Sequence, residues 1–171
     1  MTTATQGTEL HPVPTWASES GVCKLKESMA DANSGTTLDR VLIAERIGRY
    51  GWGFDERSEN LVGECFTDDG VWAGSVMGET SIGPFVGRST IVKWMSDFWV
   101  TLADQRRHSF TNIAIDDLTD TAATAYAYLT LLRSYEKKLE FVTAGPYRFV
   151  MRKEERIWRI ARLDAGFDIP F

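Results

Sequence analysis

The sequence predicts an α+β protein in which three helices precede a long, mainly antiparallel sheet. Before about residue 103, apolar residues recur at three- and four-residue steps, as they do on one face of a helix. From His108 onward they recur at every second residue, as they do on one face of a strand. Helices followed by a run of strands form an α+β plan. A long sheet that curls around a helix leaves a cavity closed at one end, and we expect a ligand to bind there.

Three segments have helical spacing, and each begins near a residue that can cap a helix. In the first segment, Gly51 and Gly53 weaken the end of the helix. The second segment stops at the sequence TDDG, where Asp68 and Asp69 are expected to form a turn. The predicted helices are 38–54, 58–66 and 91–103, and the candidate N-caps are Thr37, Ser58 and Ser89 or Thr90.

The strands are predicted from alternation and from the polar turns between them. A short strand is expected at 71–77, and Gly83 and Pro84 then break the chain. The turns DDLTD, EKK and RKEER separate the later strands. These later strands are predicted at 108–115, 121–135, 139–151 and 157–163.

Composition limits the partners and the compartment. The net charge of −5 is spread along the chain, which argues against nucleic acid or an anionic membrane as the main partner. Cys23 and Cys65 do not suggest a disulfide framework, so we expect free thiols and a reducing compartment. The first residues do not resemble a signal peptide, and no apolar run approaches the ~20 residues that span a bilayer. We expect a cytoplasmic protein that binds a small molecule.

The chain is expected to form one domain after a flexible leader. Residues 1–37 are rich in Thr, Ser, Ala and Gly and have no sustained period, which is typical of a leader. Residues 38–171 are long enough for a single domain with a substantial core. Within the leader, Trp16 and Val22 are the apolar residues that could pack against the domain.

Metal and nucleotide motifs are missing from the sequence. HExxH, CxxC, GxxxxGK[ST] and GxGxxG are all absent, and the chain has two histidines, too few for a His-rich metal site. We therefore expect no metal and no cofactor.

The order of several short motifs suggests a family. Tyr50 stands five positions before Asp55, and FTDDGVW, VGRSTI, RHSFTN and a final W-R-I strand follow. Over about residues 38–165 this order resembles the SnoaL-like group of the nuclear transport factor 2-like (cystatin-like α+β barrel) superfamily. The resemblance implies a curved, mixed but mainly antiparallel sheet, a cone-like barrel, wrapped around the N-terminal helices. Hexachlorocyclohexane dehydrochlorinase, scytalone dehydratase and bile-acid 7α-dehydratase are similar members, and they pair a His with an Asp without a cofactor.

The resemblance also implies roles for three residues. His108 falls where the dehydrochlorinase has its catalytic His, Asp55 where it has the Asp that orients that His, and Tyr50 matches a tyrosine of the bile-acid dehydratase. The pattern departs at the final strand, where the dehydrochlorinase's catalytic arginine aligns at or near Leu163, one position from Arg162. Scytalone dehydratase's second catalytic histidine has no counterpart.

The chemistry follows from the residue types as well. An imidazole is a natural general base near neutral pH, and a carboxylate on its other nitrogen fixes the tautomer and stabilises the imidazolium. We therefore expect Asp55 and His108 within hydrogen-bonding distance, about 2.6–3.2 Å, facing a cavity between the helices and the sheet. The alternatives are that Asp55 only caps a helix, that His108 lies on the surface, and that Tyr50 is a core aromatic.

Two classes of function remain open. The first is a cofactor-independent lyase, of dehydratase or dehydrohalogenase type, or an isomerase acting on a largely apolar, cyclic small molecule. The second is a non-catalytic binding or partner subunit, such as a ring-hydroxylating dioxygenase β subunit, and a polyketide cyclase is a further alternative.

We expect a homodimer or homotrimer, because Tyr126, Tyr128, Leu129 and Leu131 are predicted to be exposed strand positions. The candidate substrate-binding residues are Trp52, Phe54, Trp72, Trp94, Phe98, Asn112 and Arg162.

Overall fold

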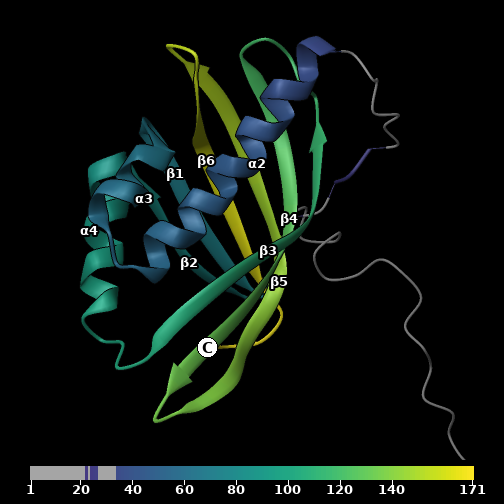
Figure 1. Cartoon of the computed structure of the whole chain (residues 1–171). Coiled ribbons are helices and arrows are strands. Elements are labelled where there is room, and N and C mark those ends of the chain that lie inside the picture. The colour runs from purple at the N-terminus through teal and green to yellow at the C-terminus, as the bar shows by residue number, and fades with distance from the viewer. Residues whose placement is uncertain (1–21, 23, 27–33) are drawn as a thin grey trace, which may run out of the picture.

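The described part of the computed structural model comprises residues 22, 24–26 and 34–171, and it contains three helices and six strands (Figure 1). The helices are α2 (Ser34–Asp55), α3 (Glu59–Cys65) and α4 (Arg88–Trp99). The strands are β1 (Phe66–Val76), β2 (Thr80–Val86), β3 (Gln105–Asp116), β4 (Ala122–Tyr135), β5 (Lys138–Glu154) and β6 (Ile157–Phe167). The predicted α+β class is confirmed.

The six strands form one mixed sheet in the order β2-β1-β6-β5-β4-β3. Neighbouring strands are antiparallel except β1 and β6, which run parallel. The sheet is strongly curved and α2 crosses its concave side, while α3 and α4 lie near β1 and β2 (Figure 1). Because β2 and β3 are edge strands that do not pair with each other, the cone stays open rather than closing into a barrel.

The helices form largely for the reasons that the sequence suggested. The Ser58 side chain accepts a hydrogen bond from the Leu61 backbone N–H, so the predicted cap of α3 is confirmed. Gly53 does not end α2 but lets α3 approach, because a Cβ at this position would lie 2.9 Å from the Val62 backbone nitrogen. Thr37 is not an N-cap, since α2 already begins at Ser34.

Three further local predictions were wrong. Residues 67–70 belong to an irregular part of β1, where the register with β6 shifts, rather than to a turn. Residues 80–86 form β2, an edge strand that tolerates Pro84 because its missing N–H needs no partner there. Gly87 precedes α4 with a φ of 92°, so neither Ser89 nor Thr90 caps this helix.

The core lies between the helices and the concave side of the sheet. Leu129 and Leu131, which we expected to be exposed, are 0% and 4% exposed within this core. Their side chains alternate with those of the convex side, where Tyr128 is half exposed. The core-facing residues of the last three strands are Ala123, Ala125, Ala127, Leu129, Leu131, Tyr147, Phe149, Met151, Trp158, Ile160, Leu163, Ala165 and Phe167.

Part of the predicted leader packs against the sheet. Val22 is buried, and the Lys26 backbone N–H donates to Asp116 on β3 at 3.0 Å. The Tyr126 hydroxyl, on β4, donates to the Lys24 carbonyl at 3.3 Å, so Tyr126 is covered rather than exposed. Trp16 lies outside the described residues. Among the helices that the structure describes, none combines the length and the apolar character needed to cross a membrane.

Candidate active site

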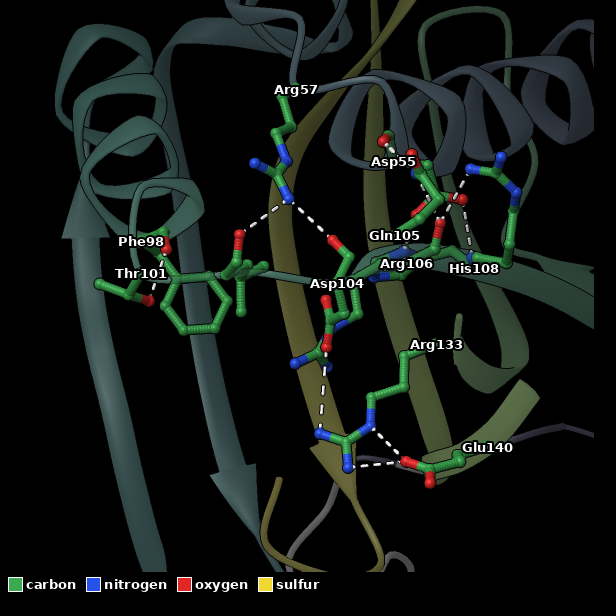
Figure 2. Close-up of polar contacts among 12 residues, drawn as sticks. Asp55, Arg57, Phe98, Thr101, Asp104, Gln105, Arg106, His108, Arg133 and Glu140 are labelled. Carbon is green, nitrogen blue, oxygen red and sulfur yellow. Dashed lines mark hydrogen bonds and ion pairs between the residues drawn. The ribbon is translucent and has the colours of Figure 1, made fainter. Parts of the chain in front are cut away.

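Asp55 and His108 form a buried pair where the end of α2 meets β3 (Figure 2). Asp55 Oδ1 lies 2.6 Å from His108 Nδ1, and Asp55 Oδ2 accepts the His108 backbone N–H at 2.8 Å. The two side chains are only 6% and 5% exposed. Because a carboxylate accepts hydrogen bonds, this contact favours the tautomer of the uncharged ring that has its proton on Nδ1 and a lone pair on Nε2, as a general base requires. The predicted contact is confirmed.

Backbone contacts fix the position of Asp55. The Gln105 side-chain amide donates to the Asp55 carbonyl at 2.7 Å (Figure 2). Arg57 donates to the carbonyl oxygens of Leu102 and Asp104, at 3.0 and 2.8 Å, and so ties the end of α2 to the loop before β3 (Figure 2). These contacts fix the end of α2, which carries Asp55, against β3 and the loop before it.

Two neighbours limit the movement of the imidazole. The Phe54 ring lies 4.6 Å from the His108 ring, measured between centroids. Gly51, one turn before Asp55, lets α2 approach β3 closely, because a Cβ there would lie 3.3 Å from the His108 Cβ and 3.2 Å from a ring carbon of Phe110. The close packing of α2 on β3 therefore sets the orientation of His108.

His108 faces a cavity of about 180 Å³ between α2, α4 and the sheet. Larger depressions exist on the described surface, such as one of about 620 Å³ between α3 and α4, but that one contains neither Asp55 nor His108. The cavity beside His108 is mostly apolar, and its position matches the predicted one. Its lining residues are Tyr50, Phe54, Trp72, Ile82, Trp94, Phe98, Arg106, His108, Leu131, Tyr147, Phe167 and Phe171.

Two tyrosine hydroxyls add polar groups to the cavity. The Trp72 indole N–H donates to the Tyr50 hydroxyl at 3.0 Å, so the hydroxyl proton of Tyr50 stays available for a further acceptor. Burial raises the pKa of Tyr50 well above its usual value, and it raises the pKa of Tyr147 in the same way. Both hydroxyls therefore remain protonated at neutral pH and can act as hydrogen-bond donors.

Aromatic rings form one wall of the cavity. Trp94 and Trp72 line it with centroids 4.4 Å apart, and Phe85, which does not line the cavity, stacks on Trp94 with centroids 4.2 Å apart and an interplanar angle of 17°. Phe98 continues the row, nearly parallel to Trp94. Flat apolar surfaces of this kind suit a flat, ring-containing ligand.

The structure brings together most, but not all, of the predicted site residues. Three of them lie outside the cavity. Trp52 is 65% exposed, Asn112 is exposed at an irregularity of β3 with a φ of 53°, and Arg162 is exposed and pairs with Asp164 at 2.7 Å. The predicted residues that line the cavity are Tyr50, Phe54, Trp72, Trp94, Phe98 and His108.

Sequence reasoning missed half of the lining residues, which are Ile82, Arg106, Leu131, Tyr147, Phe167 and Phe171. Arg106 carried a usable signal, because it lies two positions before His108 and alternation places both on the same side of a strand. The directions of Ile82, Leu131, Tyr147 and Phe167 depend on which face of each strand is concave, and Phe171 lies beyond the last strand. In the part of the chain that the structure describes, no cluster of three or more His, Cys, Asp or Glu side chains could hold a metal ion.

Three helices against an open, curved, mixed sheet, with a cavity between them, define the cystatin-like α+β fold. Residues 35–164 match the SnoaL-like domain, and the chain belongs to this family. No curated protein matches the sequence.

Several solved structures share the fold. A protein from Catenulispora acidiphila in complex with S-DNPA has 26% identity and a TM-score of 0.66, over 76% of this chain and 93% of that one. ActVI-ORFA from Streptomyces coelicolor has 21% identity and a TM-score of 0.64, over 75% and 96%. A Novosphingobium aromaticivorans protein, provisionally described as the β subunit of an aromatic-ring-hydroxylating dioxygenase, has 12% identity and a TM-score of 0.71, over 81% and 94%.

Proposed function

We propose that the protein is a cofactor-independent lyase or isomerase in which His108 removes a proton from a carbon atom of its substrate. The observation that carries this proposal is the buried Asp55–His108 pair at an apolar cavity. A histidine that served only the fold would not need a carboxylate on Nδ1 together with a ring facing a cavity.

The pair supplies what proton abstraction needs. His108 Nε2 accepts the proton, and Asp55 holds the ring in the basic tautomer and stabilises the imidazolium that forms. Such a base contributes about 10²–10⁴-fold to a rate. Tyr50 is placed to donate a hydrogen bond to a polar group of the substrate. Loss of a leaving group from the neighbouring carbon would make the enzyme a dehydratase or dehydrohalogenase, and return of the proton elsewhere would make it an isomerase.

The cavity favours a small, ring-containing substrate. Apolar protein cavities of about 150 Å³ accommodate benzene, and this one measures about 180 Å³. The aromatic wall of Trp72, Trp94 and Phe98 supports the same size and shape. A cyclisation, as in polyketide cyclases, uses the same base and remains an alternative reaction type.

The second candidate is a non-catalytic binding or partner subunit. Its support is the similarity to the protein provisionally described as a dioxygenase β subunit, which at 12% identity concerns the fold alone. The Asp55–His108 geometry favours the enzyme, because a binding subunit has no use for an oriented base.

The test combines turnover with binding. The protein is given small cyclic compounds that carry a hydroxyl or a halogen β to an activating group. Elimination is followed by the ultraviolet absorbance of the conjugated product. We expect His108→Ala to abolish turnover while quenching of Trp72 and Trp94 fluorescence by bound ligand persists, because the lost interaction belongs to the transition state. His11→Ala, which changes the chain's other histidine, is the matched control. Full turnover in His108→Ala would leave the binding subunit as the better interpretation.

A further inference from the structure

Besides His108, one other basic side chain lines the cavity, that of Arg106. Of the residues described as lining the cavity, only Arg106 and His108 are basic, and none is acidic. The Arg106 side chain is 9% exposed, which is unusual for arginine. Arg106 and His108 lie two positions apart on β3, where they pair with Arg133 and Leu131 of β4. Both residues line this cavity, as expected for side chains on the same side of a strand, and Arg106 also borders a depression beside Asp104 and Arg133.

The ion pair of Arg106 orients its guanidinium without occupying all of it. Nε donates to Asp104 Oδ1 at 2.8 Å, and the Asp104 side chain is 10% exposed (Figure 2). No other described residue accepts a hydrogen bond from the Arg106 side chain. Buried ion pairs contribute little to stability compared with apolar packing, so stability alone does not explain an arginine at this wall. The terminal N–H groups can instead serve a ligand.

The pairing leaves Arg106 better suited to a neutral oxygen than to a second carboxylate. Asp104 already balances the charge of Arg106, and Asp55 places a negative charge beside His108. An incoming carboxylate would add a further negative charge to a buried site. A carbonyl oxygen enters neutral and gains negative charge only as the proton leaves, when the donors of Arg106 stabilise it most.

We propose that Arg106 binds the carbonyl oxygen of the substrate, and that the substrates are ketones or related carbonyl compounds whose acidic C–H lies next to that carbonyl. This inference rests on the proposed function, because it names the substrate class of the same base. Two residues along a strand span about 6.6 Å. A carbonyl group and its α-carbon bridge such a gap when each protein group lies about 3 Å from its substrate atom.

The step balances without a cofactor. His108 Nε2 takes the proton from the α-carbon, the C–H electron pair forms the enolate double bond, and the carbonyl oxygen takes the negative charge against Arg106. In an elimination, the enolate electrons then expel the group on the β-carbon, which leaves with the proton from the imidazolium. In the isomerisation of a β,γ-unsaturated ketone, proton removal gives a dienolate, and the imidazolium returns the proton to its γ-carbon.

The structure separates this role from that of Tyr50. Along β3, His108 lies between Arg106 and Phe110, and the Tyr50 ring contacts Phe110 with centroids 6.1 Å apart. Arg106 and Tyr50 therefore approach His108 from opposite directions. We assign the carbonyl to Arg106, which leaves Tyr50 for the departing group.

The inference can be tested by binding acetophenone labelled with ¹³C at its carbonyl, a ketone of one-ring size. Hydrogen bonds from a guanidinium draw electron density from a carbonyl and move its resonance downfield, so we expect a downfield shift on binding to the native protein. The double variant Asp104→Asn, Arg106→Met removes the guanidinium donors without leaving one charge of the pair buried alone, since methionine has a similar length and no N–H group. It should lose the shift and bind acetophenone about 10- to 100-fold more weakly, as expected for a hydrogen bond to a charged group. Ethylbenzene, which lacks the oxygen, should bind both proteins equally.

Two single variants complete the design. Arg133→Gln removes the exposed arginine that also faces Asp104, at 4.0 Å, and it should change neither the shift nor the affinity. His108→Ala should keep the shift while losing turnover, so a failure of the base and a failure of the carbonyl contact give different results. An unchanged shift and affinity in the double variant, or no acetophenone binding by the native protein, would overturn the assignment.

Discussion

Replacing Asp55 with asparagine changes one atom and tests why the pair needs a carboxylate. Both oxygens of Asp55 accept hydrogen bonds, one from the His108 backbone N–H and one from the His108 ring. An asparagine that keeps the backbone contact presents its NH₂ group to Nδ1. The ring must then accept at Nδ1 and carry its proton on Nε2, so the cavity faces an N–H instead of a base.

The opposite orientation of the amide has its own cost. With the asparagine oxygen toward Nδ1, the NH₂ group faces the His108 backbone N–H, and one buried donor loses its partner at about 1–3 kcal/mol. The flipped amide keeps the tautomer but lacks the charge that stabilises the imidazolium, so the variant loses activity in either orientation. The corresponding change in the serine-protease triad lowers kcat about 10⁴-fold. We expect a loss of about 10³–10⁴-fold for Asp55→Asn, and a fall of about 1–3 kcal/mol in the free energy of unfolding if the amide flips.

Nitrogen NMR of the histidine rings measures this outcome directly, without a substrate. The chain has only two histidines, so His11→Gln assigns the His108 signals. In the uncharged ring we expect the proton on Nδ1 in the native protein and on Nε2 in Asp55→Asn. Asp164→Asn, which removes a largely buried carboxylate that pairs with Arg148 and Arg162, is the matched control. The native tautomer in Asp55→Asn, together with an unchanged free energy of unfolding, would refute the reasoning, because a flipped amide keeps the tautomer only at the cost of stability.

Three other changes probe the packing, the tyrosines and the assembly. Gly51→Ala should displace His108 by a few tenths of an ångström and lower turnover about tenfold, whereas Gly48→Ala, with no atom within 4 Å of the new Cβ, should raise stability by up to about 1 kcal/mol and leave turnover unchanged. Because burial raises the pKa of Tyr50 and Tyr147 in the folded state, the free energy of unfolding should fall as the pH rises above about 10, the pKa in the unfolded chain. Tyrosinate absorbance should show these two residues ionising only on unfolding, and Tyr50→Phe should remove part of the delayed step. Light scattering should give the mass of a dimer or trimer, because Tyr128 and Phe141 are about half exposed, and a 19.2 kDa monomer at micromolar concentration would contradict this.

Much of the fold could be predicted because local signals and tertiary packing agree. Ser58 supplied a cap, and the alternation of β4 to β6 matched a sheet with one side in the core. The failures occurred where tertiary context overrides local signals. Pro84 normally breaks a strand, but at a sheet edge its missing N–H costs nothing. Gly51 looks like a weak point of a helix in the sequence, yet it lies where α2 touches β3 and a Cβ would meet His108 and Phe110.

The candidate site could be predicted from the sequence only where the spacing of residues fixes the direction of a side chain. Trp52 lies two residues after Tyr50, which turns it about 200° around the helix and away from the cavity. Arg162 precedes the core residue Leu163, so alternation places it on the convex side. Asn112 lies at a register shift, which no periodic pattern reports. The family resemblance implied an arginine on the final strand, whereas the arginine that lines the cavity is Arg106 on β3. The direction of the Arg106 side chain follows from that of His108, two positions along the strand.

Asp55 also completes the edge of the sheet. β3 is an edge strand, and edge strands can pair with strands of other chains through their free backbone groups. The His108 backbone N–H is such a group, and it donates a hydrogen bond to Asp55 Oδ2. Asp55→Ala, which leaves no acceptor for this N–H, should therefore lose solubility as well as activity, because it frees a pairing site on the edge. One side chain therefore covers a free backbone N–H of the edge strand and, in the proposed reaction, orients the base.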